Sequence, residues 1–444
     1  KAGHALADYG LTVRESDVAK LAAQRFSNKE IAGYKTLPES IFQQLEDFIL
    51  TNRSKDTDAL ELMGLSAKKG IGKVITAKNY VGIITLNDGT TIEILPKIYS
   101  ASMDDNFGAR TKRVLLDMLR TLRKMPFKSL QNSCVNIEKM NIFEIFIRMF
   151  VNEVFFIVKR GLKCSYEAIA ENTTFFKGKI LFSKQVKLNC FHKERNYVEY
   201  DAFTANRPEN KLLKATLIYL CKRTTSSKNR SDIKSLLSVF SNVEASTDYK
   251  GDFAKYISDR NMKDYNTALM WCRVFLSGKS FTSFAGSEIA LALLFPMETL
   301  FENYVAAVLR KKLSGSGFTV SVQDKTYHLF DEPGKKFLMK PDIVVRRKSD
   351  GVSFVLDTKW KILDAGKVNY GITQADMYQM FAYQKKYGAE RVILLYPETE
   401  KISLEDNIEF RSDDDVVVRV QFIDLFNVTN SIAEVIQQFD VIAV

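Results

Sequence analysis

Two short stretches decide how the last third of the chain folds: Lys340-Pro-Asp-Ile-Val-Val345 and, fifteen residues beyond Asp342, Val355-Leu-Asp-Thr-Lys-Trp360. Both are apolar and rich in β-branched residues, which predicts strands. Because successive side chains of a strand alternate between faces, Asp357 and Lys359 share one face. If Asp342 begins the neighbouring strand, two carboxylates and one lysine converge at an edge of a sheet.

These side chains suit the hydrolysis of a phosphodiester bond. The two carboxylates and the backbone carbonyl of Thr358 are the hard oxygen ligands that Mg²⁺ prefers, with Mn²⁺ as an alternative. The metal would polarise the phosphate and acidify the attacking water, while Lys359 orients that water or offsets charge in the transition state. The alternative is that Asp342 is a turn residue and that Asp357 and Lys359 form a surface pair.

Two predicted helices flank these strands and offer further polar groups. The preceding helix carries Glu298 and Glu302 four residues apart on one face, so either glutamate is a candidate to add a carboxylate to the metal site. The following helix carries Gln379 and Tyr383, which also share a face and are expected to point toward the same site.

The whole chain is predicted to be a multidomain α+β protein with boundaries at 1–105, 106–294 and 295–444. The first region reads as a β-rich module with one helix at 41–50 and a hairpin turning at Asn87 to Gly89. The second reads as mainly helical, with short strands at 177–182 and 196–203 and an exposed loop at 222–235. The third reads as α/β, with helices at 296–312, 373–387 and 432–439 and strands at 318–322, 340–347, 352–360, 391–396 and 416–425.

Composition narrows the class of protein and of partner. The chain has 444 residues, of which 46% are hydrophobic, so it is globular rather than disordered. Its 64 Lys and Arg against 53 Asp and Glu give a net charge of +11, which favours a polyanion such as double-stranded DNA as partner. Five scattered Cys and three His argue against zinc sites and disulfides and favour a reducing cytoplasm. No clean apolar span of about 20 residues and no signal peptide is found, so no membrane partner is expected.

The complete arrangement resembles the PD-(D/E)xK (restriction-endonuclease-like) nuclease superfamily, including its Q-x-x-x-Y helix. More narrowly, it resembles the McrC family of McrBC-type restriction systems and the related LlaJI-type restriction subunits. The residues that carry this resemblance are Met297-Glu-Thr-Leu-Phe-Glu-Asn-Tyr304, Leu356-Asp-Thr-Lys-Trp-Lys361, Ala375-Asp-Met-Tyr-Gln-Met-Phe-Ala-Tyr383, Leu394-Leu-Tyr-Pro397, Arg160-Gly-Leu162, Gly178-Lys-Ile180, Asn210 and Ile92-Glu-Ile-Leu-Pro-Lys-Ile98.

The resemblance implies a role for each matching position. Asp342 and Asp357 would be metal ligands, and Lys359 would be the catalytic lysine. Glu302 would be the acid contributed by the helix and a further metal ligand. By the same resemblance, the polar residues of the following helix, Gln379 and Tyr383, would support the site or face DNA.

The resemblance also implies a partner, because McrC-like proteins dock on an McrB-like AAA+ GTPase ring and stimulate its hydrolysis of GTP. Consistent with that division, the chain has no G-x-x-x-x-G-K-[ST] motif, and Gly70-Ile-Gly-Lys73 lacks both the leading spacing and the following Ser or Thr. We therefore expect an Mg²⁺-dependent endonuclease subunit that binds no nucleotide of its own.

Two other functions stay open at this point. One is a non-catalytic bridging and activating subunit that uses the nuclease fold for DNA contact or assembly. The other, a free-standing repair nuclease, is disfavoured by the nearly 290 residues that precede the motif.

Overall fold

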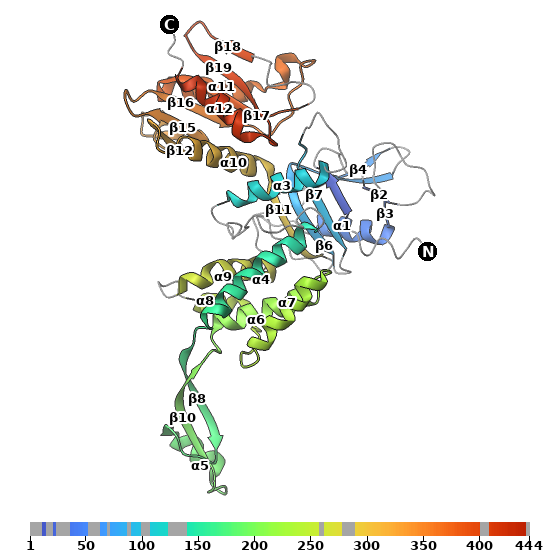
Figure 1. The fold of residues 1–444 in the computed structure, drawn as a ribbon, viewed down its shortest axis with the longest axis vertical. Coiled ribbons are helices and arrows are strands. Elements are labelled where there is room, and N and C mark those ends of the chain that lie inside the picture. The colour runs from blue at the N-terminus through green and yellow to red at the C-terminus, as the bar shows by residue number, and fades with distance from the viewer. Residues whose placement is uncertain are drawn as a thin grey trace. The chain divides into compact units, whose positions relative to one another are not determined.

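A computed structural model describes most of the chain, as two compact units. The described residues are 11–14, 21–23, 36–51, 63–68, 72–86, 90–98, 107–122, 140–256, 262–277, 289–399 and 408–440 (Figure 1). The first unit comprises Lys1–Ile142 with Ser280–Val444, and the second comprises Phe143–Lys279. Among the described residues no helix is long and apolar enough to cross a bilayer.

The N-terminal part of the first unit is built from two sheets and is β-rich, as the sequence indicates. One sheet has the order β1-β7-β6-β11 and the other β3-β2-β5-β4. The elements are β1 (Leu11–Arg14), β2 (Leu21–Ala23), β3 (Thr36–Leu37), α1 (Glu39–Thr51), β4 (Met63–Lys68), β5 (Gly72–Ala77), β6 (Tyr80–Leu86), β7 (Thr91–Leu95), α3 (Phe107–Arg120) and β11 (Ile289–Pro296). β6 and β7 pair in antiparallel fashion, whereas the turn expected at Asn87 to Gly89 lies outside the described residues.

Strand β11 lies elsewhere than the sequence suggests. It pairs with β6, with Leu293 opposite Ile83, and so belongs to the N-terminal sheet rather than to a mainly helical region ending at residue 294. Its run Ile-Ala-Leu-Ala-Leu-Leu-Phe is apolar throughout. Periodicity does not distinguish such a buried strand from a buried helix, which explains the misplaced boundary.

Helices form the body of the second unit, as predicted. They are α4 (Ile142–Arg160), α6 (Pro208–Cys221), α7 (Ser227–Val239), α8 (Tyr249–Lys255) and α9 (Lys263–Ser277). The loop predicted at 222–235 is wrong, because α7 begins within it. Ser226 is the N-cap of α7 and accepts a hydrogen bond from the backbone N–H of Asn229, so these Ser and Asn residues start a helix rather than a loop.

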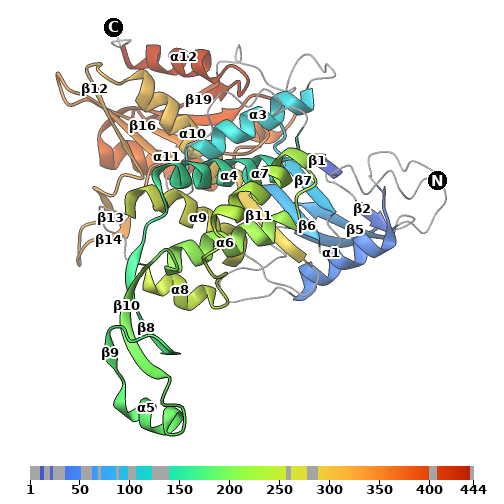
Figure 2. The same cartoon turned by 60° about the horizontal axis from the view of Figure 1, so that its bottom comes forward.

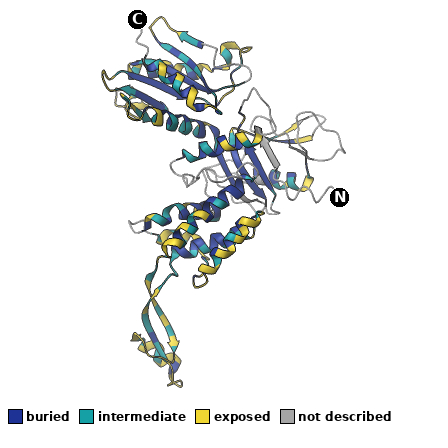
Figure 3. Ribbon diagram, in the orientation of Figure 1, coloured by how far each residue is buried: buried dark blue, intermediate teal, exposed yellow. Residues whose placement is uncertain are grey.

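A long antiparallel ribbon extends from the helices of this second unit (Figures 1 and 2). It consists of β8 (Ser165–Thr173) and β10 (Asn196–Thr204), with β9 (Lys179–Ile180) and α5 (Phe182–Asn189) at its far end. We call residues 165–204 the β8–β10 ribbon. β8 was not predicted, because neither of its faces is buried and its sequence therefore shows no alternation (Figure 3).

The C-terminal part of the first unit is a six-stranded mixed sheet with the order β12-β15-β16-β17-β19-β18. The central pairs β16–β17 and β17–β19 are parallel, and the outer pairs are antiparallel. The elements are α10 (Met297–Lys312), β12 (Phe318–Val322), β13 (His328–Phe330), β14 (Lys336–Leu338), β15 (Ile343–Arg347), β16 (Ser353–Thr358), α11 (Gln374–Tyr387), β17 (Ala389–Pro397), β18 (Ile408–Arg411), β19 (Val417–Ile423) and α12 (Val428–Asp440). The mixed α/β prediction for this region is confirmed; β13, β14 and β18 were not predicted.

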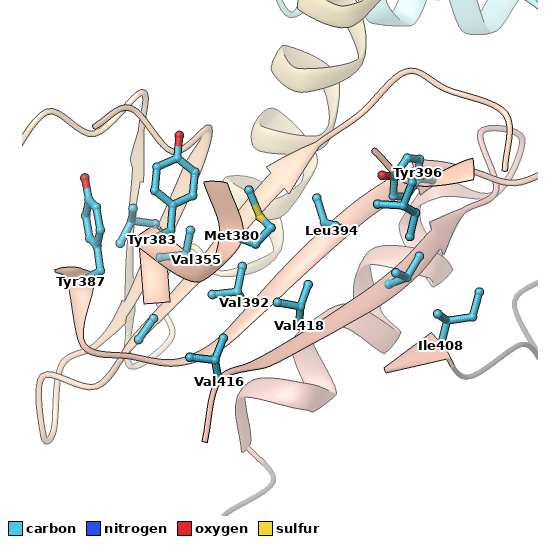
Figure 4. Close-up of a cluster of buried hydrophobic side chains, with 14 of the residues drawn as sticks. Val355, Met380, Tyr383, Tyr387, Val392, Leu394, Tyr396, Ile408, Val416 and Val418 are labelled. Atoms are coloured by element: carbon cyan, nitrogen blue, oxygen red, sulfur yellow. The ribbon is translucent and has the colours of Figure 1, made fainter. Parts of the chain in front are cut away.

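Helices cover both faces of this sheet. α11 packs on one face, where Met380 and Tyr383 join Val355 and Leu394 in a buried cluster (Figure 4). On the other face Phe354 contacts Phe439 of α12, with ring centroids 4.9 Å apart. Because side chains alternate along β16, the face that carries Val355 also carries Asp357 and looks toward α11.

Candidate active site

The candidate residues lie where three neighbouring strands of this sheet meet. β15 and β16 are antiparallel with Ile343 opposite Leu356, so one further step of the same register puts Asp342 opposite Asp357. On the other side of β15, the backbone N–H just after β12 belongs to Gln323 and donates to the carbonyl of Asp342 at 2.8 Å. The register of the sheet therefore brings together carboxylates that are fifteen residues apart in sequence.

Hydrogen bonds hold Asp342 in place, and the surrounding protein buries Asp357. Asp342 Oδ2 accepts hydrogen bonds from the backbone N–H of Thr358 at 2.8 Å and from its hydroxyl at 2.7 Å. Asp357 is only 2% exposed. Burial of this kind excludes a solvated surface pair for Asp357 and Lys359, which was the alternative that the sequence left open.

Lys359 is held by three groups. Its Nζ lies 2.8 Å from Asp357 Oδ2 as an ion pair, and 3.5 Å from Asp376 Oδ1. It also donates to Gln379 Oε1 at 3.2 Å, and Gln379 Nε2 in turn donates to the hydroxyl of Tyr383 at 2.8 Å. Gln379 thus contacts the lysine directly, and Tyr383 is linked to it through Gln379.

Of the two glutamates on α10, the structure brings Glu302 to this site. Gln323 Nε2 donates to Glu302 Oε1 at 2.6 Å and to Asp342 Oδ1 at 3.3 Å, so one amide group bridges the two carboxylates. Glu298 is exposed in the first turn of the helix. Gln323 was not identified from the sequence, since a glutamine at a strand end carries no recognisable signal.

Asp376 is a second residue that the sequence analysis missed. It accepts hydrogen bonds from Lys361 Nζ at 2.7 Å and from the Thr373 hydroxyl at 2.6 Å, in addition to its contact with Lys359. Thr373 is the N-cap of α11 and accepts from the backbone N–H of Asp376. An N-cap Thr with an acid three residues later is the sequence pattern of a capping box and was available in the sequence, although here the acid accepts from the Thr373 hydroxyl and not from its backbone N–H.

The carboxyl groups are held in an unfavourable electrostatic environment. Burial raises the pKa of Asp357, and the charge of Asp342 raises it further. Burial likewise raises the pKa of Asp342. Burial and then repulsion from Asp342 raise the pKa of Glu302 to about 7. Although burial works against its charge, Lys359 has a raised pKa because Asp357 stabilises the ammonium group.

The donor set matches the chemistry of Mg²⁺. Among the described residues, no three His, Cys, Asp or Glu side chains are already grouped around one point. Mg²⁺, however, is commonly held by one or two carboxylates, with water and substrate phosphate completing the shell. Asp342 and Asp357 are two such oxygen donors, and their raised pKa values mark negative charge that a cation would balance.

Comparison with known proteins gives the class. A family model described as McrBC 5-methylcytosine restriction system component matches residues 75–397, which is more than half of the chain. The protein is therefore a component of a restriction system. It belongs to the McrBC family, and the predicted resemblance is confirmed at that level. The comparison with curated protein sequences found no match.

Two solved structures from Thermococcus gammatolerans are similar. The first is a half-complex from a tetradecameric assembly of McrB AAA+ hexamers with bound McrC, with a TM-score of 0.67, 17% identity, and coverage of 97% of this chain and 100% of that chain. The second is the cryo-EM structure of the McrBC complex, with a TM-score of 0.48, 18% identity, and coverage of 69% and 88%. The first shows that the fold is shared along essentially the whole length of both chains.

We predict that Glu302→Gln stabilises the metal-free chain in a pH-dependent manner. Glu302 keeps its proton up to about pH 7 in the folded state, so wild-type stability falls as the pH rises from 4.5 toward 7. The glutamine removes this charge and keeps an oxygen acceptor for Gln323. We expect a melting temperature at least about 2 °C higher at pH 8 and little change at pH 5, measured by scanning fluorimetry in EDTA.

The control is Glu298→Gln, an exposed acid on the same helix, for which we expect no pH-dependent gain. Equal effects of Glu302→Gln at both pH values would contradict the assigned environment.

Proposed function

We propose that this chain is the McrC-like endonuclease subunit of a GTP-dependent McrBC-type restriction system and cleaves double-stranded DNA with Mg²⁺. The domain would be a nuclease of the PD-(D/E)xK superfamily. The observation that carries this proposal is a pair of opposed carboxylates, the buried Asp357 and the half-buried Asp342, with Lys359 fixed beside Asp357. The fold shared with the McrC-containing assembly supports it.

Each residue would have a distinct task. Asp342, Asp357, the backbone carbonyl of Thr358 and Glu302 would hold Mg²⁺, which when bound polarises the phosphodiester and acidifies water. Lys359 would stabilise the negative charge that accumulates on the phosphate in the transition state. Because its ammonium group is already held by Asp357, Asp376 and Gln379, it pays little conformational entropy to act.

The β8–β10 ribbon is the candidate contact for an McrB-like AAA+ partner. Its far end exposes large apolar side chains, each between 51% and 94% exposed: Phe175, Phe176, Phe182, Val186, Leu188 and Phe191. Exposed apolar side chains gathered in this way are typical of protein interaction surfaces. The charge of residues 165–204 supports this choice, because six basic residues are balanced by five acidic ones.

The ribbon is firmly fixed at its base. Asn210 is fully buried, and its Nδ2 donates to the carbonyl of Lys163 at 3.0 Å, just before β8, and to that of Ala205 at 2.8 Å, just after β10. Its Oδ1 accepts from the Tyr265 hydroxyl at 3.0 Å. Asn210 therefore joins both ends of the ribbon to the helices. A ribbon that acts on a partner would require such a fixed attachment.

The alternative of a non-catalytic bridging and activating subunit has less support. It leaves the gathering of Asp342, Asp357 and Lys359 without a purpose, although their charges are costly to bury.

We predict that Asp357→Ala abolishes DNA cleavage but leaves partner binding and stimulated GTP hydrolysis unchanged. The substitution removes one metal-binding carboxylate and the ion-pair partner of Lys359. Cleavage would be measured with the McrB-like GTPase, Mg²⁺, GTP and a duplex containing 5-methylcytosine. Asp413→Ala, at an exposed position between β18 and β19, is the matched control and should cut normally. Cleavage by Asp357→Ala at the wild-type rate would refute the site assignment.

We also predict that Mg²⁺ stabilises the wild-type chain. At about 100 times its dissociation constant, a ligand that binds only the folded state adds about 2.7 kcal/mol, which corresponds to several degrees in melting temperature. Asp342→Asn retains an acceptor for Thr358 but loses the charge, so its shift should be much smaller. Equal shifts in wild type and variant, at matched ionic strength, would place the ion elsewhere.

For the ribbon, we predict that Phe175→Ser combined with Phe176→Ser lowers stimulated GTP hydrolysis by about tenfold or more, because exposed aromatic anchors dominate the energy of most interfaces. Stabilisation by Mg²⁺ should be unchanged. Phe156→Ser, at an exposed position on α4 outside the ribbon, is the control. Normal stimulation by the double variant would show that the partner binds another surface.

A further inference from the structure

A small hairpin inserted between two strands of the six-stranded sheet has no part in the function described so far. β13 and β14 are inserted between β12 and β15 and pair only with each other. Their apolar side chains are largely exposed, with Phe330 at 54% and Phe337 at 73%. Leu329 and Leu338 beside them are exposed as well. A two-stranded hairpin that buries so little is not explained by its contribution to the core.

The backbone of this hairpin is shaped to bring two aromatic rings together. Phe330 lies opposite Lys336, so in a regular strand Phe337 would point to the opposite face. Phe337 instead has a φ of 58°, in the left-handed region that a bulky residue rarely adopts. The two rings meet edge to face with centroids 5.8 Å apart. The conformational cost of Phe337 thus produces an exposed aromatic pair rather than a buried one.

The hairpin is rigidly mounted on α11. The buried Asp324 at its base accepts hydrogen bonds from the Tyr387 hydroxyl at 3.1 Å and from the backbone N–H of Thr326 at 2.9 Å. The ring of Tyr327 packs edge to face on Tyr387, with centroids 4.7 Å apart. In the segment between β13 and β14, Asp331 forms an ion pair with Lys386 of α11 at 2.9 Å. The exposed rings are therefore held in a defined position.

Both ends of the hairpin lead directly into the candidate active site. Gln323, which bridges Glu302 and Asp342, comes just before it, and Asp342 follows β14 after three residues. Phe337 is five residues from Asp342 and so lies within about 17 Å of it even along an extended chain. At about 3.4 Å per base-pair step this is about five base pairs. A duplex held at the site would therefore pass within reach of the rings.

The charge around the rings matches a polyanion. Four exposed lysines lie on the hairpin and its base, at positions Lys325, Lys335, Lys336 and Lys340. Against them stand two exposed acids, Asp331 and Glu332, of which Asp331 is already paired with Lys386, while the third acid, Asp324, is buried. The exposed surface of the hairpin therefore carries more basic than acidic side chains.

We propose that the β13–β14 hairpin is a DNA-contact element that grips the duplex beside the cleaved phosphate. Its lysines contact backbone phosphates, and the Phe330–Phe337 pair inserts into the adjacent minor groove against the base edges, as apolar wedges do in other DNA-binding proteins. This proposal rests on the proposed nuclease function and adds a second contact to it.

The test measures binding of a fluorescein-labelled duplex to the full chain by fluorescence anisotropy, in EDTA so that no cleavage occurs. Phe330→Ser with Phe337→Ser should weaken binding by about tenfold. Lys335→Gln with Lys336→Gln should reduce the slope of log affinity against log salt by about two, because two phosphate contacts are lost. Melting curves would show that both variants are folded.

Matched controls are Phe381→Ser on α11 and Lys311→Gln with Lys312→Gln at the end of α10, which should bind as the wild type does. Wild-type affinity and salt dependence in the hairpin variants, or no binding of duplex by the unsubstituted chain, would overturn the proposal. So would a loss of GTPase-partner binding with DNA binding unchanged, which would make the hairpin a protein-docking surface. Failure of the nuclease function itself would appear instead as cleavage by Asp357→Ala, independently of these binding data.

Discussion

The antiparallel register of β15 and β16 sets the half-buried Asp342 opposite the buried Asp357, and this placement of two carboxylates costs free energy. Burial raises the pKa of both carboxyl groups, and the charge of Asp342 raises the pKa of Asp357 further. The neighbouring groups reduce this cost from several directions. Thr358 donates two hydrogen bonds to Asp342, Lys359 pairs with Asp357, and the amide of Gln323 lies between Asp342 and Glu302.

The arrangement persists because the apolar core fixes the elements that carry it. Met380 and Tyr383 hold α11 against Val355 and Leu394 (Figure 4), and this packing aims Gln379 at Lys359. A core selected only for stability would replace the buried charges with neutral side chains. Retaining them is the kind of compromise between stability and activity that catalytic sites show, which is why the nuclease role accounts for the geometry better than a scaffold role.

The central part of the site was predictable because it depends on local periodicity. The two-residue period of a strand places Asp357 and Lys359 on one face, and the helical period does the same for Gln379 and Tyr383. Gln323 was not predictable, because it reaches Asp342 only through the pairing of β12 with β15, which the sequence does not encode locally. Features without the usual alternating pattern were missed for a related reason, as with β8, neither face of which is buried, and β11, which is apolar throughout.

Two of the family motifs outside the candidate active site contain buried polar residues with a structural role. Glu93, within the quoted stretch Ile92 to Ile98, is 2% exposed and accepts a hydrogen bond from the backbone N–H of Ile142, the first residue of α4. Lys112 completes the anchor through an ion pair with Glu93 at 3.1 Å and a hydrogen bond to the carbonyl of Met140 at 2.9 Å. Asn210 plays the corresponding part at the base of the β8–β10 ribbon. The family resemblance thus extends beyond the candidate active site because these buried polar side chains hold the first residue of α4 and both ends of the ribbon in place.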